Sequence, residues 1–109
     1  MEWSKYRTMW LLVMFDLPVD SKPRRRRYSQ FRKFLLKDGY LMLQFSVYGR
    51  PCASEENAEV HYLRIRANLP SEGQVRILSL TDKQFERMRV FFGGKTEKLE
   101  RGFAQLEMF

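Results

Sequence analysis

Residues 11–28 read LLVMFDLPVDSKPRRRRY, an apolar run that ends in a single acid, Asp16, shortly before four consecutive arginines. The run begins at Met9 and is almost uninterrupted, whereas a strand with one solvent face would alternate. It therefore predicts a central strand that is covered on both faces. Pro18 and the capping side chains after it predict the end of this strand and a helix that begins at Lys22 or Pro23.

The composition predicts one folded domain over residues 1–109. A chain of 109 residues and 13.2 kDa is too short for two ordinary domains. Its 44% hydrophobic and 15% aromatic residues supply a core and argue against a disordered chain. The net charge of +7 and the pI of about 9.9 make a polyanion the first partner to consider.

Cysteine and histidine usage limits the chemistry of the chain. Cys52 and His61 are the only residues of their types, which excludes an internal disulfide and a Cys/His zinc site within one chain. A lone His61 also suggests a core or surface histidine rather than a catalytic base. The longest apolar run, residues 9–15, is too short for a membrane span or a signal sequence. We expect a cytoplasmic protein without a membrane segment.

The middle of the chain alternates between helical and strand-like patterns. Tyr28, Phe31 and Leu35 form one stripe of a first helix that stops at Gly39. Residues 40–50 alternate with a period of two and predict either one bent strand or two strands that meet near Gln44 to Ser46, ended by Gly49 to Pro51.

A second helix, with a stripe of apolar residues, begins after an N-cap at Ser54 and ends at Pro70. Residues 74–81 form a fourth strand-like segment after Gly73. The order is β-α-β-β-α-β, which predicts an α+β, ferredoxin-like fold with an antiparallel sheet.

Trp10, Leu12 and Met14 alternate along the first strand and share one of its faces. Two helices on one side of the sheet leave this other face uncovered. An uncovered apolar face predicts a partner, most simply a second copy, so we expect a homodimer packed through the sheet faces at these three residues.

Residues 81–109 are predicted to extend the core. Thr81 with Gln84 forms a capping-box pattern that opens a short helix. The segment RVFFGG reads as a short strand with a turn, residues 95–102 as a polar stretch, and FAQLEMF at residues 103–109 as a strand. An apolar tail needs a partner, so we expect it to pair with a sheet edge of the partner chain.

Asp16 has two interpretations. An acid at a strand end can merely meet solvent or cap the next turn. If two chains pack their sheet faces together, however, each contributes Asp16 near the twofold axis, and two close carboxylates share a proton or bind a divalent cation such as Mg2+. One carboxylate per chain is a poor metal site, so such a site would have to straddle the dimer.

The first helix carries a dense basic surface without acids except Asp20 and Asp38 at its ends. Unpaired like charges destabilise a helix, so phosphate contact explains them better than a solvated face. The candidate nucleic-acid contacts are Arg24, Arg25, Arg26, Arg27, Arg32, Lys33 and Lys37. Arg26, Lys33 and Lys37 point outward and Arg25 and Arg32 share one flank, whereas Arg24 points over the end of the sheet. Such a stripe suits backbone contact and carries no base specificity.

An aromatic stacking platform for RNA is not supported. An RNA-recognition domain of the same topology needs a Gly- and aromatic-rich signature on its third strand, which QFSVYGR lacks. We therefore expect most of the nine phenylalanines to lie in the core.

Four segments, in their order along the chain, resemble the small CRISPR-associated adaptation protein, the second of the two proteins shared by nearly all spacer-acquisition systems. They are VMFDLP, an Arg-rich helix ending in FLLKDGY, LQFSVYGR and GQVRILSLTDKQFE. The resemblance covers about the whole chain, and it is closest to variants that accompany single-protein RNA-guided DNA nuclease effectors.

This resemblance implies a ferredoxin-like homodimer whose sheets face each other. It also implies a metal-dependent endonuclease acting on RNA or DNA, with the aspartate that ends the first strand, here Asp16, as catalytic Mg2+ ligand. In the adaptation complex the dimer is expected to bridge two dimers of the integrase subunit and to support the duplex of the incoming DNA on its basic surface. The sequence departs from a nuclease pattern in offering no second acid or histidine beside Asp16.

Three hypotheses follow. The first is a scaffold that binds duplex DNA phosphates and the integrase subunit, and the second is a phosphodiesterase that uses Asp16. The third is a dimeric ferredoxin-like domain without a nucleic-acid role, which the unpaired basic helix disfavours.

Overall fold

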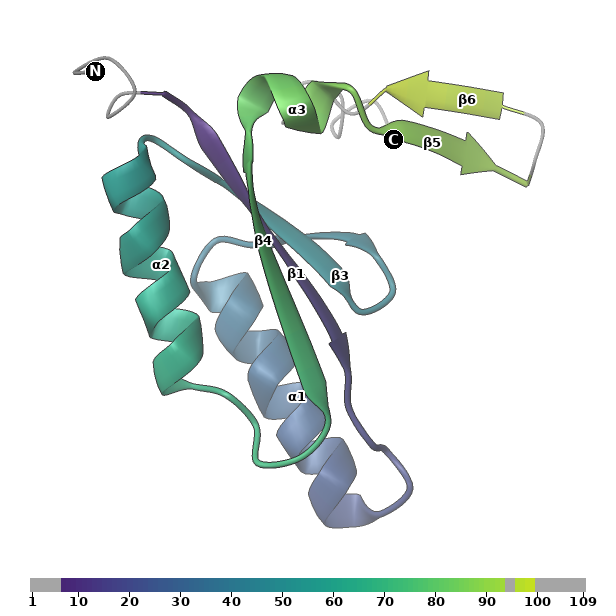
Figure 1. Cartoon of the computed structure of the whole chain (residues 1–109). Helices are drawn as coiled ribbons and strands as arrows, with labels where there is room; N and C mark the ends of the chain where they lie inside the picture. Colours follow the sequence, from purple (N-terminus) through teal and green to yellow (C-terminus); the bar gives the residue numbers. More distant parts are fainter. Residues whose placement is uncertain (1–6, 94–95, 100–109) are drawn as a thin grey trace.

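The computed structural model describes residues 7–93 and 96–99 and has the predicted α+β, ferredoxin-like architecture (Figure 1). Its antiparallel sheet has the strand order β2-β3-β1-β4. The apolar run forms β1 (Met9–Asp16), which lies between β3 (Val47–Cys52) and β4 (Gln74–Thr81). The edge opposite β4 is β2 (Leu41–Gln44). The first strand is therefore central, as its sequence predicts.

Two helices cover one face of the sheet (Figure 1), and both begin where the sequence predicts. In α1 (Lys22–Lys37), the N-cap Ser21 accepts a hydrogen bond from the Arg24 amide, and the helix stops before Gly39, whose φ is +92°. In α2 (Glu55–Ala67) the N-cap is Ser54, and the helix ends before the expected stop at Pro70. No helix among the described residues is long and apolar enough to cross a membrane.

The hydrophobic core lies between these helices and the sheet. Its fully buried members, with at most 1% of their surface exposed, are Val13, Leu35, Tyr48, Cys52 and Ile65. Val13, Leu35 and Ile65 come from the strand and the helical stripes that the sequence predicts, whereas Cys52 lies beyond the predicted end of its strand. The burial of all five residues holds α1 and α2 against β1 and β3.

Residues 41–52 form two strands, which confirms one of the two alternatives for this segment. They meet at a tight turn in which Ser46 adopts a φ of +62°. The prediction that Gly49 to Pro51 end the strand is wrong, because β3 continues to Cys52. Gly49 lies inside the sheet opposite Leu12, where a Cβ would come within 3.2 Å of the leucine side chain. The glycine permits close packing instead of a turn.

The second face of the sheet is only partly open. After β4, the chain turns into α3 (Asp82–Glu86), and Phe85 stacks on the Trp10 ring at a centroid distance of 3.9 Å. The Trp10 indole donates to the Asp82 carboxylate at 2.9 Å. Trp10 and Leu12 are 1% and 5% exposed, so the expectation that this face is uncovered is wrong for both. The chain covers them itself because α3 folds back over the sheet.

After α3, the described part of the C-terminal extension forms a hairpin of β5 (Arg89–Phe92) and β6 (Thr96–Leu99). The first strand of this hairpin is predicted by the sequence, but β6 falls within the stretch interpreted as merely polar. The predicted strand at residues 103–109 lies outside the described residues. Phe91 on β5 is 58% exposed, so this hairpin presents apolar surface.

Candidate nucleic-acid interface

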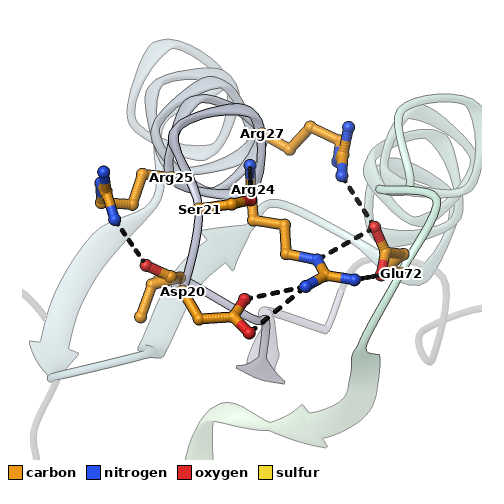
Figure 2. Close-up of polar contacts among 7 residues, drawn as sticks. Asp20, Ser21, Arg24, Arg25, Arg27 and Glu72 are labelled. Carbon is orange, nitrogen blue, oxygen red and sulfur yellow. Dashed lines mark hydrogen bonds and ion pairs between the residues drawn. The ribbon is translucent and has the colours of Figure 1, made fainter.

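The first turn of α1 brings the arginine run to the end of the sheet (Figure 2). Ser21 and Pro23 fix the start of the helix, and consecutive residues then point about 100° apart around its axis. Arg24 and Arg27 consequently point toward the loop between α2 and β4. Arg25 turns the other way and donates to the Val19 carbonyl at 3.1 Å.

Glu72, from the loop before β4, neutralises part of this run. Its carboxylate accepts two hydrogen bonds from Arg24, at 3.0 and 3.4 Å, and one from Arg27 at 2.7 Å (Figure 2). Asp20 forms a second ion pair with Arg24 at 3.0 Å. The hydrogen bonds from Arg24 lower the pKa of both carboxyl groups, so both are charged at neutral pH.

The expectation that the basic helix lacks acid partners is therefore wrong for Arg24 and Arg27. Two carboxylates balance these two guanidinium groups. The sequence of the helix alone cannot predict this contact, because Glu72 is 45 residues beyond Arg27 in sequence. The signal that finds it is topological, since β4 begins at the sheet end where β1 finishes.

The remaining candidate cations are exposed on α1. They are Arg25, Arg26, Arg32, Lys33 and Lys37. Within residues 7–93 and 96–99, none of these five side chains pairs with an acid. They occupy the outward face and one flank of the helix, as the helical spacing predicts, and form what we call the free basic surface.

Asp16 is exposed at the end of β1 and lies in a hollow of 290 Å³ on the face opposite α1 and α2. In the β1/β4 register it is opposite Gln74, and Arg76 lies two residues further along the same face. The same hollow is lined by Phe45 and Ser46 from the β2/β3 turn. The structure gives no direct contact between Asp16 and the arginines of α1, so the acid and the arginine run form separate sites.

The described residues of one chain do not fit a magnesium ion. No group of three or more His, Cys, Asp or Glu side chains lies at ligand spacing in the part of the chain that the structure describes. The hollow around Asp16 also holds the cationic Arg76, which disfavours a second cation. Any metal at Asp16 would need ligands from a second copy of the chain.

A second ionic cluster lies at the other end of α1. Asp38 accepts from Arg64 at 2.8 Å and lies 2.8 Å from Nδ1 of His61, which is 4% exposed. Burial raises the pKa of Asp38, but the contacts with His61 and Arg64 outweigh it and hold the pKa below its usual value. His61 is thus a core histidine paired with an acid, in agreement with the sequence analysis.

The chain matches the family described as CRISPR associated protein Cas2 over residues 9–88. A relative from Flavobacterium psychrophilum is 49% identical over 97% of this chain and 92% of its own length. Another from Parvibaculum lavamentivorans is 50% identical over 93% of this chain and all of its own length. Both relatives are named CRISPR-associated endoribonuclease Cas2.

A solved structure of a protein described as Cas2 has the same fold. It aligns with a TM-score of 0.54 at 20% sequence identity, and covers 85% of this chain and 98% of the solved chain.

Proposed function

Because the chain belongs to the CRISPR associated protein Cas2 family, we propose that it is a subunit of CRISPR spacer acquisition. In this role it is a homodimeric scaffold that binds the phosphates of duplex DNA and connects to the integrase subunit. The chemistry of strand transfer belongs to that integrase subunit. The scaffold role requires a basic surface that reads no base sequence.

The free basic surface of α1 is the observation that carries this proposal. The helix has 16 residues, so it is about 24 Å long and offers cations along a length comparable with several phosphate spacings. Arg25, Arg26, Arg32 and Lys33 have no acid partners among the described residues. Contacts from such a surface fix the position of a duplex without selecting its sequence.

The open half of the second sheet face supports dimerisation. Met14 is half-buried there, and Leu78, opposite Leu12 on β4, is 47% exposed. Trp10 and Leu12 are already covered by α3, so a second copy would cover chiefly the Met14 and Leu78 region. The helices lie on the opposite face, which leaves both copies of α1 free for DNA (Figure 1).

The outer edge of β4 is a second place for contact between copies. Eight residues of β4 pair with β1 on one side, and the described chain places no strand on the other. We propose that the extension at residues 81–109 pairs with this edge of the other copy. The double variant Leu78→Ser with Phe91→Ser should sediment with the mass of a monomer, whereas the intact protein should sediment as a dimer.

The duplex proposal is tested by comparing free and neutralised arginines. Arg25→Gln with Arg26→Gln should weaken binding of a blunt DNA duplex about tenfold at ~100 mM salt and should lower the salt slope by up to about two. Arg24→Gln with Arg27→Gln removes the same charge from residues already paired with acids, so it should cost less. Equal effects of the two pairs, or none from the first, would contradict the proposal.

Binding of the integrase subunit is tested separately. The chain mixed with its neighbouring integrase should form a complex whose mass contains two copies of this chain. Adding duplex DNA should stabilise that complex in a salt-dependent way. If this chain and the integrase subunit keep their separate masses both with and without DNA, the proposed bridging role is wrong.

A second candidate function is hydrolysis of RNA or DNA phosphodiesters. It is favoured by the exposed Asp16 carboxylate beside Arg76, and by the endoribonuclease name of the relatives. Because one chain lacks a metal ligand set, this activity would need the Asp16 carboxylates of two copies and Mg2+ between them. Purified protein should then lose cleavage of RNA and DNA in Asp16→Asn and in excess chelator. Cleavage that survives both would come from a contaminant.

A further inference from the structure

Asp16 and Arg76 carry opposite charges in one hollow, yet they do not pair within one chain. In the β1/β4 register Arg76 lies opposite Met14 and Gln74 lies opposite Asp16, so the two charged residues are diagonal neighbours on the same sheet face. Both are exposed. Neither forms an ion pair within residues 7–93 and 96–99. Each charge is therefore available to a second molecule.

Apolar side chains surround these two charges. Met14, Phe45 and Val47 line the same hollow. Phe45 is 79% exposed, and its ring stacks against Tyr28 of α1 at a centroid distance of 6.1 Å, which holds the ring in place. Exposed apolar surface around a charged centre is stabilised when another protein surface covers it.

The hollow is continuous with the surface that the proposed dimer covers. Met14 and Leu78 form the open region of the second sheet face, and Arg76 lies opposite the first and two residues from the second along β4. A second copy that covers these two apolar residues also covers Arg76 and the neighbouring Asp16. Charges that lose their water in this way destabilise an interface unless each finds a partner of opposite sign.

Twofold symmetry supplies those partners. In a twofold dimer the same patch meets itself, so every contact between two different residues occurs twice. Two sheets stacked face to face lie about 10 Å apart, a gap that an extended arginine and a carboxylate can bridge from opposite sides. Two Asp16 carboxylates facing each other would repel, whereas Asp16 facing the partner's Arg76 attracts in both copies of the contact.

We propose that Asp16 of each protomer forms an ion pair with Arg76 of the partner subunit across the dimer. The inference rests on the proposed dimer and deepens it by naming the charges that hold it in register. The guanidinium groups supply the positive charge that a divalent cation would otherwise supply between the two carboxylates. Arg76 must therefore leave before Mg2+ can bind both Asp16 side chains, so it opposes the hydrolytic candidate function.

Charge reversal tests the two ion pairs. Arg76→Asp and Asp16→Arg should each weaken the dimer about tenfold or more, because like charges then meet across the interface. The double variant exchanges both charges and should recover the affinity of the intact dimer to within about threefold. Arg66→Asp makes the same change of charge on α2, on the opposite face of the sheet, and is the matched control that should keep the intact dimer. Sedimentation over a range of protein concentrations measures all of these affinities.

A neutral variant keeps the test independent of misfolding and separates the arginine from a metal ion. Arg76→Gln removes the cation without adding a like charge, so its dimer should be about threefold weaker or more. Millimolar Mg2+ should strengthen the Arg76→Gln dimer, whose carboxylates lack a counter-charge, and should leave the intact dimer unchanged. If Mg2+ strengthens both dimers equally, a metal ion and not Arg76 holds the carboxylates, and the inference is wrong.

The outcomes separate this inference from the proposed function. An intact protein that stays monomeric would contradict the proposed dimer and the ion pairs with it. An intact dimer that tolerates both single reversals, or that the double variant fails to recover, would overturn the ion pairs alone. Binding of a blunt DNA duplex tests the scaffold role independently, since neither Asp16 nor Arg76 belongs to the free basic surface.

Discussion

Beside each end of α1 lies a carboxylate that binds two cationic or basic side chains, and the two clusters differ in exposure. At the beginning of the helix, the Glu72 side chain is 40% exposed and holds Arg24 and Arg27. At the other end, the Asp38 side chain is 11% exposed and holds His61 and Arg64. Arg64 is 55% exposed, but Asp38 and His61 are largely buried, so solvent screens the first cluster more than the second. The same chemistry therefore sets mainly surface charge at one end and contributes to stability at the other.

The largest effect is expected from Asp38→Ala. It leaves the buried His61 and the neighbouring Arg64 without their acceptor, and should lower the free energy of unfolding by about 2–3 kcal/mol. Urea denaturation at neutral pH measures this loss. Arg66→Ala, an exposed residue on the same helix as Arg64, is the control and should change little. Similar curves for the two variants would show that Asp38 does not hold the helices together.

The pH dependence of unfolding should follow Asp38 as well. Its pKa is lower in the folded chain than in the unfolded one, so its contribution is complete above the unfolded value of about 3.9 and is lost as the pH falls below it. The wild type should therefore lose stability from about pH 4 downward. The free energy of unfolding of Asp38→Asn should be lower at neutral pH and should change less as the pH falls over that range. Parallel profiles for both proteins would assign acid unfolding to other carboxyl groups.

Glu72→Gln should act on binding rather than on folding. It removes the ion pair of Arg27, leaves Arg24 with Asp20 as its only acid partner among the described residues, and removes one negative charge beside the free basic surface. Affinity for a blunt DNA duplex should rise about threefold at low salt, with a steeper salt slope and an almost unchanged melting temperature. A clear fall in melting temperature would instead make this exposed cluster equivalent to the one at Asp38.

Asp20→Asn should give the smallest change in affinity for the DNA duplex. The Asp20 side chain is 72% exposed and pairs with Arg24, which keeps the two hydrogen bonds that it donates to Glu72. The same duplex titration should show a change of less than about twofold. A gain as large as that of Glu72→Gln would mean that Asp20, and not Glu72, restrains the arginine run.

Local features of the fold could be predicted because they depend on neighbouring residues. The caps at Ser21 and Ser54, the helical stripe from Tyr28 to Leu35 and the capping box at Thr81 each depend on residues within about two helical turns of one another. The central position of β1 also follows from its composition, since only a strand covered on both faces is apolar throughout.

Features that depend on where distant segments meet could not be read in the same way. The contact of Glu72 with α1 and the return of Phe85 over Trp10 depend on the path of loops that carry no periodic signal. Exposure of Phe45 likewise depends on a turn at Ser46, which the alternation of residues 40–50 gives only as one of two alternatives. These contacts decide which arginines are free and which sheet face is open, so the candidate site was less predictable than the fold.

The strand order has a consequence for synthesis of the chain. β1 is made first, yet its neighbours in the sheet are β3 and β4, and β4 ends only at Thr81. While the ribosome extends the chain, the apolar β1 is exposed without its second partner strand until most of the protein has been translated. Completion of the sheet must therefore wait for nearly full-length chains, and the nascent polypeptide carries a hydrophobic segment that invites chaperone binding during that interval.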